Sequence, residues 1–129
     1  MWKVILLISM LFFHIVDDYY LQGILASMKQ KKWWLDNAPD ELYRHDYVIA
    51  LLEHAFSWTV MTHIPIVIYR VAYQLETPAC PFLFLFIFSW LLHAWVDDQK
   101  ANKHAINLIT EQCIHIAQVV FVWFWCVSV

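Results

Sequence analysis

The stretch that decides the fold is HAWVDDQK, residues 93–100, which closes a long apolar run. A near copy, HIVDD at residues 14–18, closes the first apolar run of the chain. Ionisable groups at membrane depth are costly, and they usually pair with one another or bind a ligand. We therefore expect the rest of the fold to bring these two segments together.

The composition is that of a membrane protein. Hydrophobic residues make up 62% of the 129 residues and charged residues only 15%, whereas soluble domains carry about 25% charge. The net charge of -3 gives no reason to expect a nucleic-acid partner. The three cysteines show no CxxC spacing and are expected to be small buried apolar side chains.

Four apolar segments of membrane-spanning length predict an all-α fold, an antiparallel bundle of four transmembrane helices in a single membrane domain. Pro65 is expected to kink the second helix or to end its regular part. A short connection is expected at residues 76–81, and a longer polar one at residues 29–45. The helices are predicted at residues 2–28, 46–73, 82–100 and 104–129.

The basic residues predict the orientation. Six of the eight lysines and arginines fall in the connections after the first and third helices, and only Lys3 and Arg70 fall on the other side. The positive-inside rule therefore places both connections in the cytoplasm and both termini outside it. The six are Lys29, Lys31, Lys32, Arg44, Lys100 and Lys103.

Histidines and carboxylates four residues apart suggest a metal site. Such pairs present two ligands on one helical face, and they occur at 14/18, 93/97 and 111/115. With His54, all of them fall in one layer, in the cytoplasmic leaflet, when residues are counted back from the helix ends. His63 lies outside this layer. The predicted ligands are His14, Asp18, His54, His93, Asp97 and His115.

Mixed imidazole and carboxylate ligands suit one or two ions of zinc, manganese or iron. A general base would be Glu111 or Asp17, and the choice between Asp17 and Asp18 as ligand stays open. Substrate contacts are expected from Gln22, Lys100 and Gln112, whereas Lys29 is expected to set topology beside lipid phosphates. A site just below the headgroups favours a membrane lipid or lipid-phosphate as the substrate of a metal-dependent hydrolase.

Two other functions fit the same pattern. The histidines and carboxylates could relay protons or carry an ion, although the sealed outer halves of the helices disfavour transport. The layer could also fix the packing of a non-enzymatic membrane partner protein. Outward faces rich in Phe and Trp would meet lipid or a second copy of the chain equally well.

These motifs resemble those of a domain-of-unknown-function family of small bacterial and phage inner-membrane proteins. That family has patterns similar to H-x-x-x-D-x-x-x-Q, H-x-x-x-D-x-x-K and D-Q-x-x-H, which correspond here to residues 14–22, 93–100 and 111–115. This chain has Glu111 where the third pattern has Asp. The resemblance implies a bacterial inner-membrane location and supports a site without naming a reaction. The layout is also distantly similar to that of membrane-bound metal-dependent hydrolases.

Overall fold

The computed structural model describes residues 1–75 and 79–128, which form helices and turns and no strand. The all-α prediction is confirmed for this part of the chain. Within the predicted connection at 76–81, residues 76–78 lie outside the described residues. The elements are α1 (Trp2–Val16), the π-helical turn η1 (Asp17–Leu21), α2 (Leu25–Met28), α3 (Lys31–Asn37), the 3₁₀ turn η2 (Glu41–Tyr43), α4 (Asp46–Ala72), α5 (Ala79–Ala101) and α6 (Leu108–Ser128).

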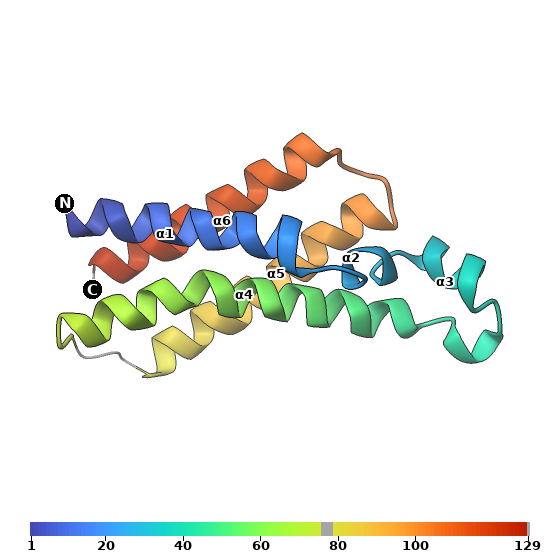
Figure 1. The fold of residues 1–129 in the computed structure, drawn as a ribbon, viewed down its shortest axis with the longest axis horizontal. Coiled ribbons are helices and arrows are strands. Elements are labelled where there is room, and N and C mark those ends of the chain that lie inside the picture. Colours follow the sequence, from blue (N-terminus) through green and yellow to red (C-terminus); the bar gives the residue numbers. More distant parts are fainter. Residues whose placement is uncertain (76–78, 129) are drawn as a thin grey trace.

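The long helices α1, α4, α5 and α6 run alternately in opposite directions along the molecule (Figure 1). Helix α4 packs chiefly against α1 and α5, while α6 packs against α1 and α5. Both termini lie at the same end (Figure 1). There Lys3 Nζ donates to the Val127 carbonyl at 2.9 Å, and the Trp123 indole donates to the Lys3 carbonyl at 2.7 Å.

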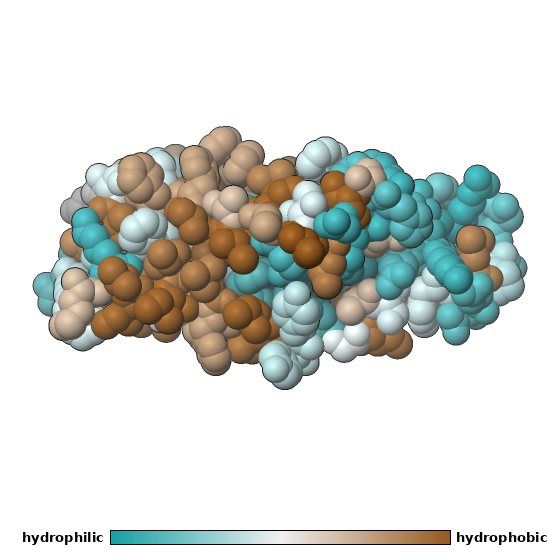
Figure 2. All heavy atoms as spheres, turned by 90° about the horizontal axis from the view of Figure 1, so that it is seen from above, coloured by the Kyte–Doolittle hydropathy of each residue, from teal (hydrophilic) through white to brown (hydrophobic). Residues whose placement is uncertain are grey.

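Three helical stretches are long and apolar enough to cross a membrane: Trp2–Leu21, Cys80–Ala101 and Leu108–Ser128. Helix α4 is not among them, because polar residues interrupt its hydrophobic sequence. In Figure 2, hydrophilic residues gather at the end of the molecule that carries α3, and hydrophobic residues cover most of the opposite half. The chain therefore has the character of a helical membrane protein.

The sequence predicted one helix over residues 2–28, but in the structure the first helix does not continue to residue 28. It widens into the π turn η1 at Asp17 and ends at Gln22, after which Gly23 takes a left-handed φ of 49°. Residues other than glycine rarely adopt this conformation, so the only glycine in the chain marks the break. The short helix α2 then packs against α4.

The last helix begins at Leu108 and not at His104 as predicted. His104 has a left-handed φ of 53°, which a helix cannot continue through. The Asn107 side chain accepts a hydrogen bond from the Thr110 amide at 2.9 Å. This is an N-cap, which satisfies an amide that would otherwise lack a partner in the first helical turn.

Pro65 lies within α4 and does not end it, since the helix runs from Asp46 to Ala72. This extent is close to the predicted 46–73. Polar side chains on the same helix are turned inward: Thr59, Thr62 and His63 are buried, and both threonine hydroxyls donate to carbonyls one turn back. These polar groups of α4 thus lie inside the molecule, whereas Glu53 on the same helix is exposed.

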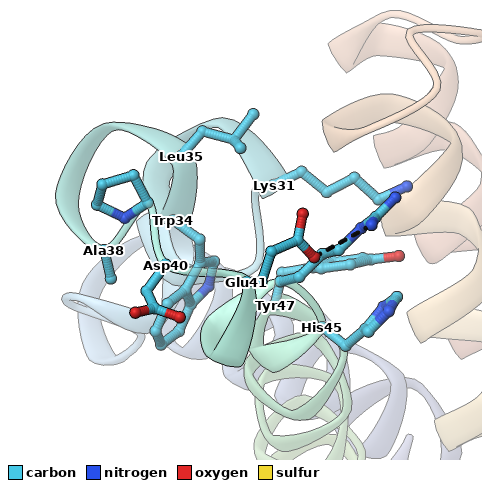
Figure 3. A pocket seen from close by; sticks show the side chains of 10 residues that line it. Lys31, Trp34, Leu35, Ala38, Asp40, Glu41, His45 and Tyr47 are labelled. Atoms are coloured by element: carbon cyan, nitrogen blue, oxygen red, sulfur yellow. Dashed lines mark hydrogen bonds and ion pairs between the residues drawn. The ribbon is translucent and has the colours of Figure 1, made fainter.

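The polar connection at residues 29–45 contains α3 and η2 (Figure 3). The Asp40 carboxylate accepts a hydrogen bond from the Leu42 amide at 2.9 Å and so begins η2. Arg44 and Glu41 form an ion pair at 3.2 Å that is largely exposed. Exposed pairs of this kind contribute little to stability.

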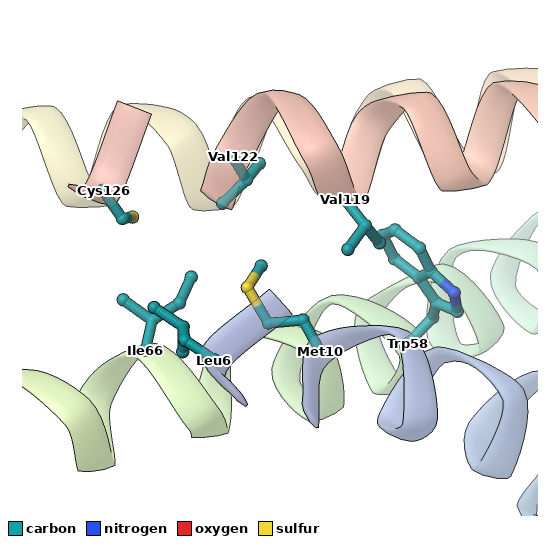
Figure 4. Close-up of a cluster of buried hydrophobic side chains, with 7 residues drawn as sticks. All are labelled: Leu6, Met10, Trp58, Ile66, Val119, Val122 and Cys126. Carbon is teal, nitrogen blue, oxygen red and sulfur yellow. The ribbon is translucent and has the colours of Figure 1, made fainter. Parts of the chain in front are cut away.

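Seven buried hydrophobic side chains from α1, α4 and α6 form a cluster (Figure 4). In water, burial of these side chains would be the main favourable contribution to the packing of these helices. Trp58 lies at the inner edge of this core and also stacks on His93, with ring centroids 4.2 Å apart. The buried members are Leu6, Met10, Trp58, Ile66, Val119, Val122 and Cys126.

The left-handed conformation of Gly23 can be tested by substitution. Gly23→Ala should lower the free energy of unfolding by about 1 kcal/mol, because a Cβ disfavours this conformation. Space is not the obstacle, since an added Cβ would meet only the Leu21 carbonyl oxygen, at 4.0 Å. Gly23→Asn should cost less, because asparagine tolerates positive φ. Unfolding in detergent measures both, and equal losses would contradict the explanation.

Candidate metal centre

Buried polar side chains from five segments meet in one group, which we call the polar cluster. Its members come from η1, from the end of α2 and from α4, α5 and α6. Five of them are buried and Asp18 is partly buried. The polar cluster consists of Asp18, Lys29, His54, His93, Asp97 and His115.

The carboxylate of Asp97 lies at the centre of the polar cluster and is fully buried. One oxygen, Oδ2, lies 2.6 Å from Lys29 Nζ and 2.9 Å from His54 Nε2. The other, Oδ1, lies 3.0 Å from His115 Nε2. Helices α2, α4 and α6 therefore each bring one nitrogen to a single carboxylate of α5.

Two sets of donor atoms in the polar cluster are close enough to hold a metal ion. One set is Asp18, His54 and His93, and the other is His93, Asp97 and His115; within each set the atoms lie within 4.8 Å of one another. Ligands about 2.1 Å from a tetrahedral ion lie about 3.4 Å apart, so small side-chain movements would complete either set. His93 belongs to both.

His93 is the residue whose surroundings point most directly to a ligand. Its ring is fully buried and contacts the rings of both Trp58 and His115. Neither ring nitrogen has a hydrogen-bond partner among the described residues, and Nε2 lies 3.7 Å from the nearer Asp97 oxygen. A buried polar atom without a partner is costly, and metal coordination would satisfy one of these nitrogens.

Lys29 is the member of the polar cluster that the sequence did not predict. The expectation that it lies at the surface, beside the phosphates of surrounding lipid, does not fit the structure, because its side chain is only 11% exposed and contacts Asp97 and His54. The feature of the sequence that could have indicated this position is Gly23, six residues earlier. The helix breaks there, and α2 packs on α4 with Lys29 at its end. A continuous helix would not dock in this way.

His14 lies beside the polar cluster and belongs to neither set of donor atoms. The Trp58 indole donates to its Nδ1 at 2.7 Å, so its Nε2 carries the proton and donates to Gln112 Oε1 at 3.2 Å. The amide nitrogen of Gln112 in turn donates to Asp18 Oδ2 at 2.8 Å. The predicted ligand His14 is thus placed to orient Asp18 through Gln112, as outer ligand shells do in metal sites.

The two neighbouring acids of η1 have different surroundings. Asp17 accepts hydrogen bonds from Ser57, at 2.7 Å, and from Gln22. Asp18 Oδ1 lies 3.5 Å from His54 Nε2, within the polar cluster. The geometry therefore favours Asp18 as the ligand. Asp17 and Gln22 connect η1 to α4 and lie away from the open side of the cluster.

A pocket of about 270 Å³ leads to the polar cluster, and we call it the charged pocket. Lys29 and Asp18 line its inner side, and Lys100 and Glu111 line its wall as an ion pair at 2.7 Å. Of the predicted substrate contacts, Lys100 and Gln112 line it and Gln22 does not. The predicted base Glu111 therefore faces a space that a substrate could occupy.

A larger pocket of about 510 Å³ lies between α3, η2 and the start of α4 (Figure 3). It shares no residue with the polar cluster. Its charged residues, among them Lys31 and Glu41, are exposed. We therefore take the charged pocket as the approach to the candidate site.

No protein-family model, curated protein or solved structure matches this chain. The resemblance of its motifs to an inner-membrane family therefore stays a prediction. Function has to be inferred from the polar cluster itself.

The dependence of Lys29 on Asp97 gives a stability prediction. Asp97→Asn should lower the free energy of unfolding by about 3 kcal/mol, because it leaves a buried ammonium without its carboxylate. Adding Lys29→Met should recover at least half of that loss. Chemical unfolding in detergent measures this coupling between Asp97 and Lys29. The proteins compared are the wild type, the two single variants and the double variant.

Asp98→Asn is the matched control on the next residue. Asp98 pairs with Lys103 at 3.0 Å, and the Lys103 side chain is 52% exposed, so this change should cost under about 1 kcal/mol. If the losses in free energy of unfolding from Asp97→Asn and Lys29→Met simply add in the double variant, the two side chains do not depend on each other.

Proposed function

We propose that this chain is a membrane-embedded metal-dependent hydrolase that acts on a lipid or lipid-phosphate from the cytoplasmic leaflet. The observation that carries the proposal is the fully buried His93 ring, whose two nitrogens lack partners inside two sets of histidine and carboxylate donors. Few other ligands satisfy an imidazole nitrogen beside two carboxylates as a divalent cation does.

We further propose that α4 is the fourth membrane-spanning helix. Its 27 residues would extend about 40 Å, more than the hydrocarbon thickness of about 30 Å. Its buried polar side chains face the other helices, whereas Phe56, Val67 and Ile68 are exposed where lipid would lie. Together with α1, α5 and α6 it would form an antiparallel four-helix bundle.

The proposed orientation places the charged pocket on the cytoplasmic side of a bacterial inner membrane. The connections from α1 to α4 and from α5 to α6 carry most of the lysines and arginines and lie at the same end of the molecule (Figure 1). By the positive-inside rule this end is cytoplasmic, and both termini are outside.

The donor atoms support zinc, manganese or iron, since they are imidazole nitrogens and carboxylate oxygens. Both sets of donors draw on the single ring of His93. This sharing favours one ion over two. Cys126 is buried in the apolar core and Cys113 is exposed, so neither belongs to the donor sets.

The residues of the charged pocket suit hydrolysis of a phosphate ester. A divalent cation held by the polar cluster would stabilise the negative charge that develops on the phosphoryl group. Water forms the new bond to phosphorus as Glu111 takes its proton, and the bond from phosphorus to the lipid oxygen breaks. Glu111 then gives that proton to the leaving oxygen. Lys29 and Lys100 would bind the phosphate oxygens.

One observation favours a second function, a proton relay. Lys29, Asp97, His54 and His115 form a continuous chain of contacts of 3.0 Å or less, and the ammonium already offsets the charge of Asp97. The hydrophobic core beyond Trp58 counts against passage across the membrane, although Thr62, His63 and Arg70 are also buried in that half of the bundle. The hydrolase proposal accounts better for the unpartnered nitrogens of His93.

Metal content tests the proposed centre. The purified protein in detergent should hold about one equivalent of zinc, manganese or iron, and His93→Ala should lower the affinity for that ion on the order of 100-fold, through loss of a ligand. Elemental analysis after dialysis against defined metal concentrations measures the affinity. Monodisperse elution of each variant shows that it is folded.

His63→Ala is the matched control, because His63 is also a buried histidine of the bundle. Its Nδ1 lies 2.8 Å from the Thr59 carbonyl, and its ring packs on Phe82 and Phe86 away from the polar cluster. Metal content should not change in this variant. A folded wild type without metal, or equal losses in both variants, would end the metal proposal.

Catalysis by Glu111 gives a separate prediction. Glu111→Gln should lower the rate of phosphate release from phosphatidic acid on the order of 100-fold or more while metal content is kept, since general-base catalysis contributes about that much. Asp17→Asn should have a much smaller effect on the rate in folded protein. Proton flux in liposomes without any hydrolysis would instead support the relay.

A further inference from the structure

An apolar groove on the side of the molecule adjoins the charged pocket. This groove, of about 550 Å³, lies between α1 and α6, which are two of the helices apolar enough to cross a membrane. The two spaces share Tyr19 and Gln112 in their walls. The charged pocket and the apolar groove are therefore neighbours that adjoin at these two side chains.

The groove is built for a hydrocarbon chain. Leu11, Ile15 and Ile116 line it, and Ile15 and Ile116 are each more than 40% exposed where lipid would surround the helices. At its inner side lie His14 and Gln112, whose hydrogen bonds lead directly to Asp18. A chain lying in the groove would thus end beside the polar cluster.

We propose that this groove seats the acyl chain of a lipid-phosphate whose phosphate monoester lies in the charged pocket, so that the substrate arrives sideways from the bilayer between α1 and α6. This inference rests on the proposed function and specifies its substrate. The charged pocket would release the phosphate to the cytoplasm, while the apolar product returns to the membrane.

Charge selects a phosphate monoester over a zwitterionic lipid. Lys29 and Lys100 line the charged pocket together with the carboxylates of Asp18 and Glu111, and Asp97 lies behind them. With a divalent ion bound, the positive charges outnumber these carboxylates. A headgroup with a net negative charge is then attracted, whereas phosphatidylcholine carries none.

Another apolar groove does not have this arrangement. It measures about 500 Å³ and lies between α1 and α4, near Trp2 and Pro65. Among the residues that the structure describes, no charged side chain lines it, and it shares none of them with the charged pocket. It is suited to surrounding lipid of any headgroup, and it serves as an internal reference for the experiment.

The test uses the full chain in nanodiscs of phosphatidylcholine that contain phosphatidic acid with a photoreactive group midway along one acyl chain. After illumination, mass spectrometry maps the labelled residues. Labelling should concentrate on Leu11, Ile15 and Ile116, and unlabelled phosphatidic acid should compete for it. Ile116→Trp, which fills the groove, should reduce this labelling at least tenfold.

Ile49→Trp is the matched control, since Ile49 is an exposed isoleucine of α4 that lines none of the pockets described above. It should leave labelling unchanged. Equal competition by phosphatidylcholine, labelling spread evenly over both grooves, or no effect of Ile116→Trp would overturn the lateral site.

Metal content and phosphate release measured on the same nanodiscs separate the two proposals. If unlabelled phosphatidic acid competes for labelling of the groove, but no metal is bound and no phosphate is released, the lipid site is supported and the hydrolase is rejected. Metal and hydrolysis together with scattered labelling would reject the groove and leave the hydrolase standing.

Discussion

The buried carboxylate of Asp97 needs partners that no single segment can supply. A carboxylate removed from water is stable only when it is paired and hydrogen-bonded. Here Lys29, His54 and His115 supply that pairing from α2, α4 and α6. The carboxylate is satisfied only when these segments are docked on α5 together, so its burial couples the positions of α2, α4, α5 and α6.

Much of the fold could be predicted because its signals are local. Apolar runs of about 20 residues indicate membrane helices, and over residues 1–75 and 79–128 the structure confirms an all-helical fold in which three helices have that character. Pairs at i and i+4 share a helical face, and the structure places His93, Asp97 and His115 together. Their metal-binding role remains a prediction.

The errors arose where a single residue outweighed a pattern. Gly23 ends the first helix although the hydrophobic sequence continues beyond it, and Asn107 caps α6 three residues after the predicted start. Lys29 could not be assigned to the polar cluster from its basic neighbourhood, because its position depends on the break at Gly23. Its burial is a tertiary effect.

The role of His14 shows a second limit. Spacing places His14 on the same stripe as Asp18, but it cannot say which partner each ring nitrogen takes. In the structure the indole of Trp58 and the amide of Gln112 occupy both nitrogens. Competition between neighbouring donors and acceptors is decided by positions within about 1 Å, which a sequence pattern does not specify.

Trp58 lies between the polar cluster on one side and the hydrophobic core on the other, where Thr62, His63 and Arg70 are also buried. If the bundle spans the membrane as proposed, the site is accessible from one leaflet and closed toward the other. Both openings, the groove toward lipid and the charged pocket toward water, would then serve the same leaflet. The protein would alter the lipid composition of that leaflet without moving any lipid to the other.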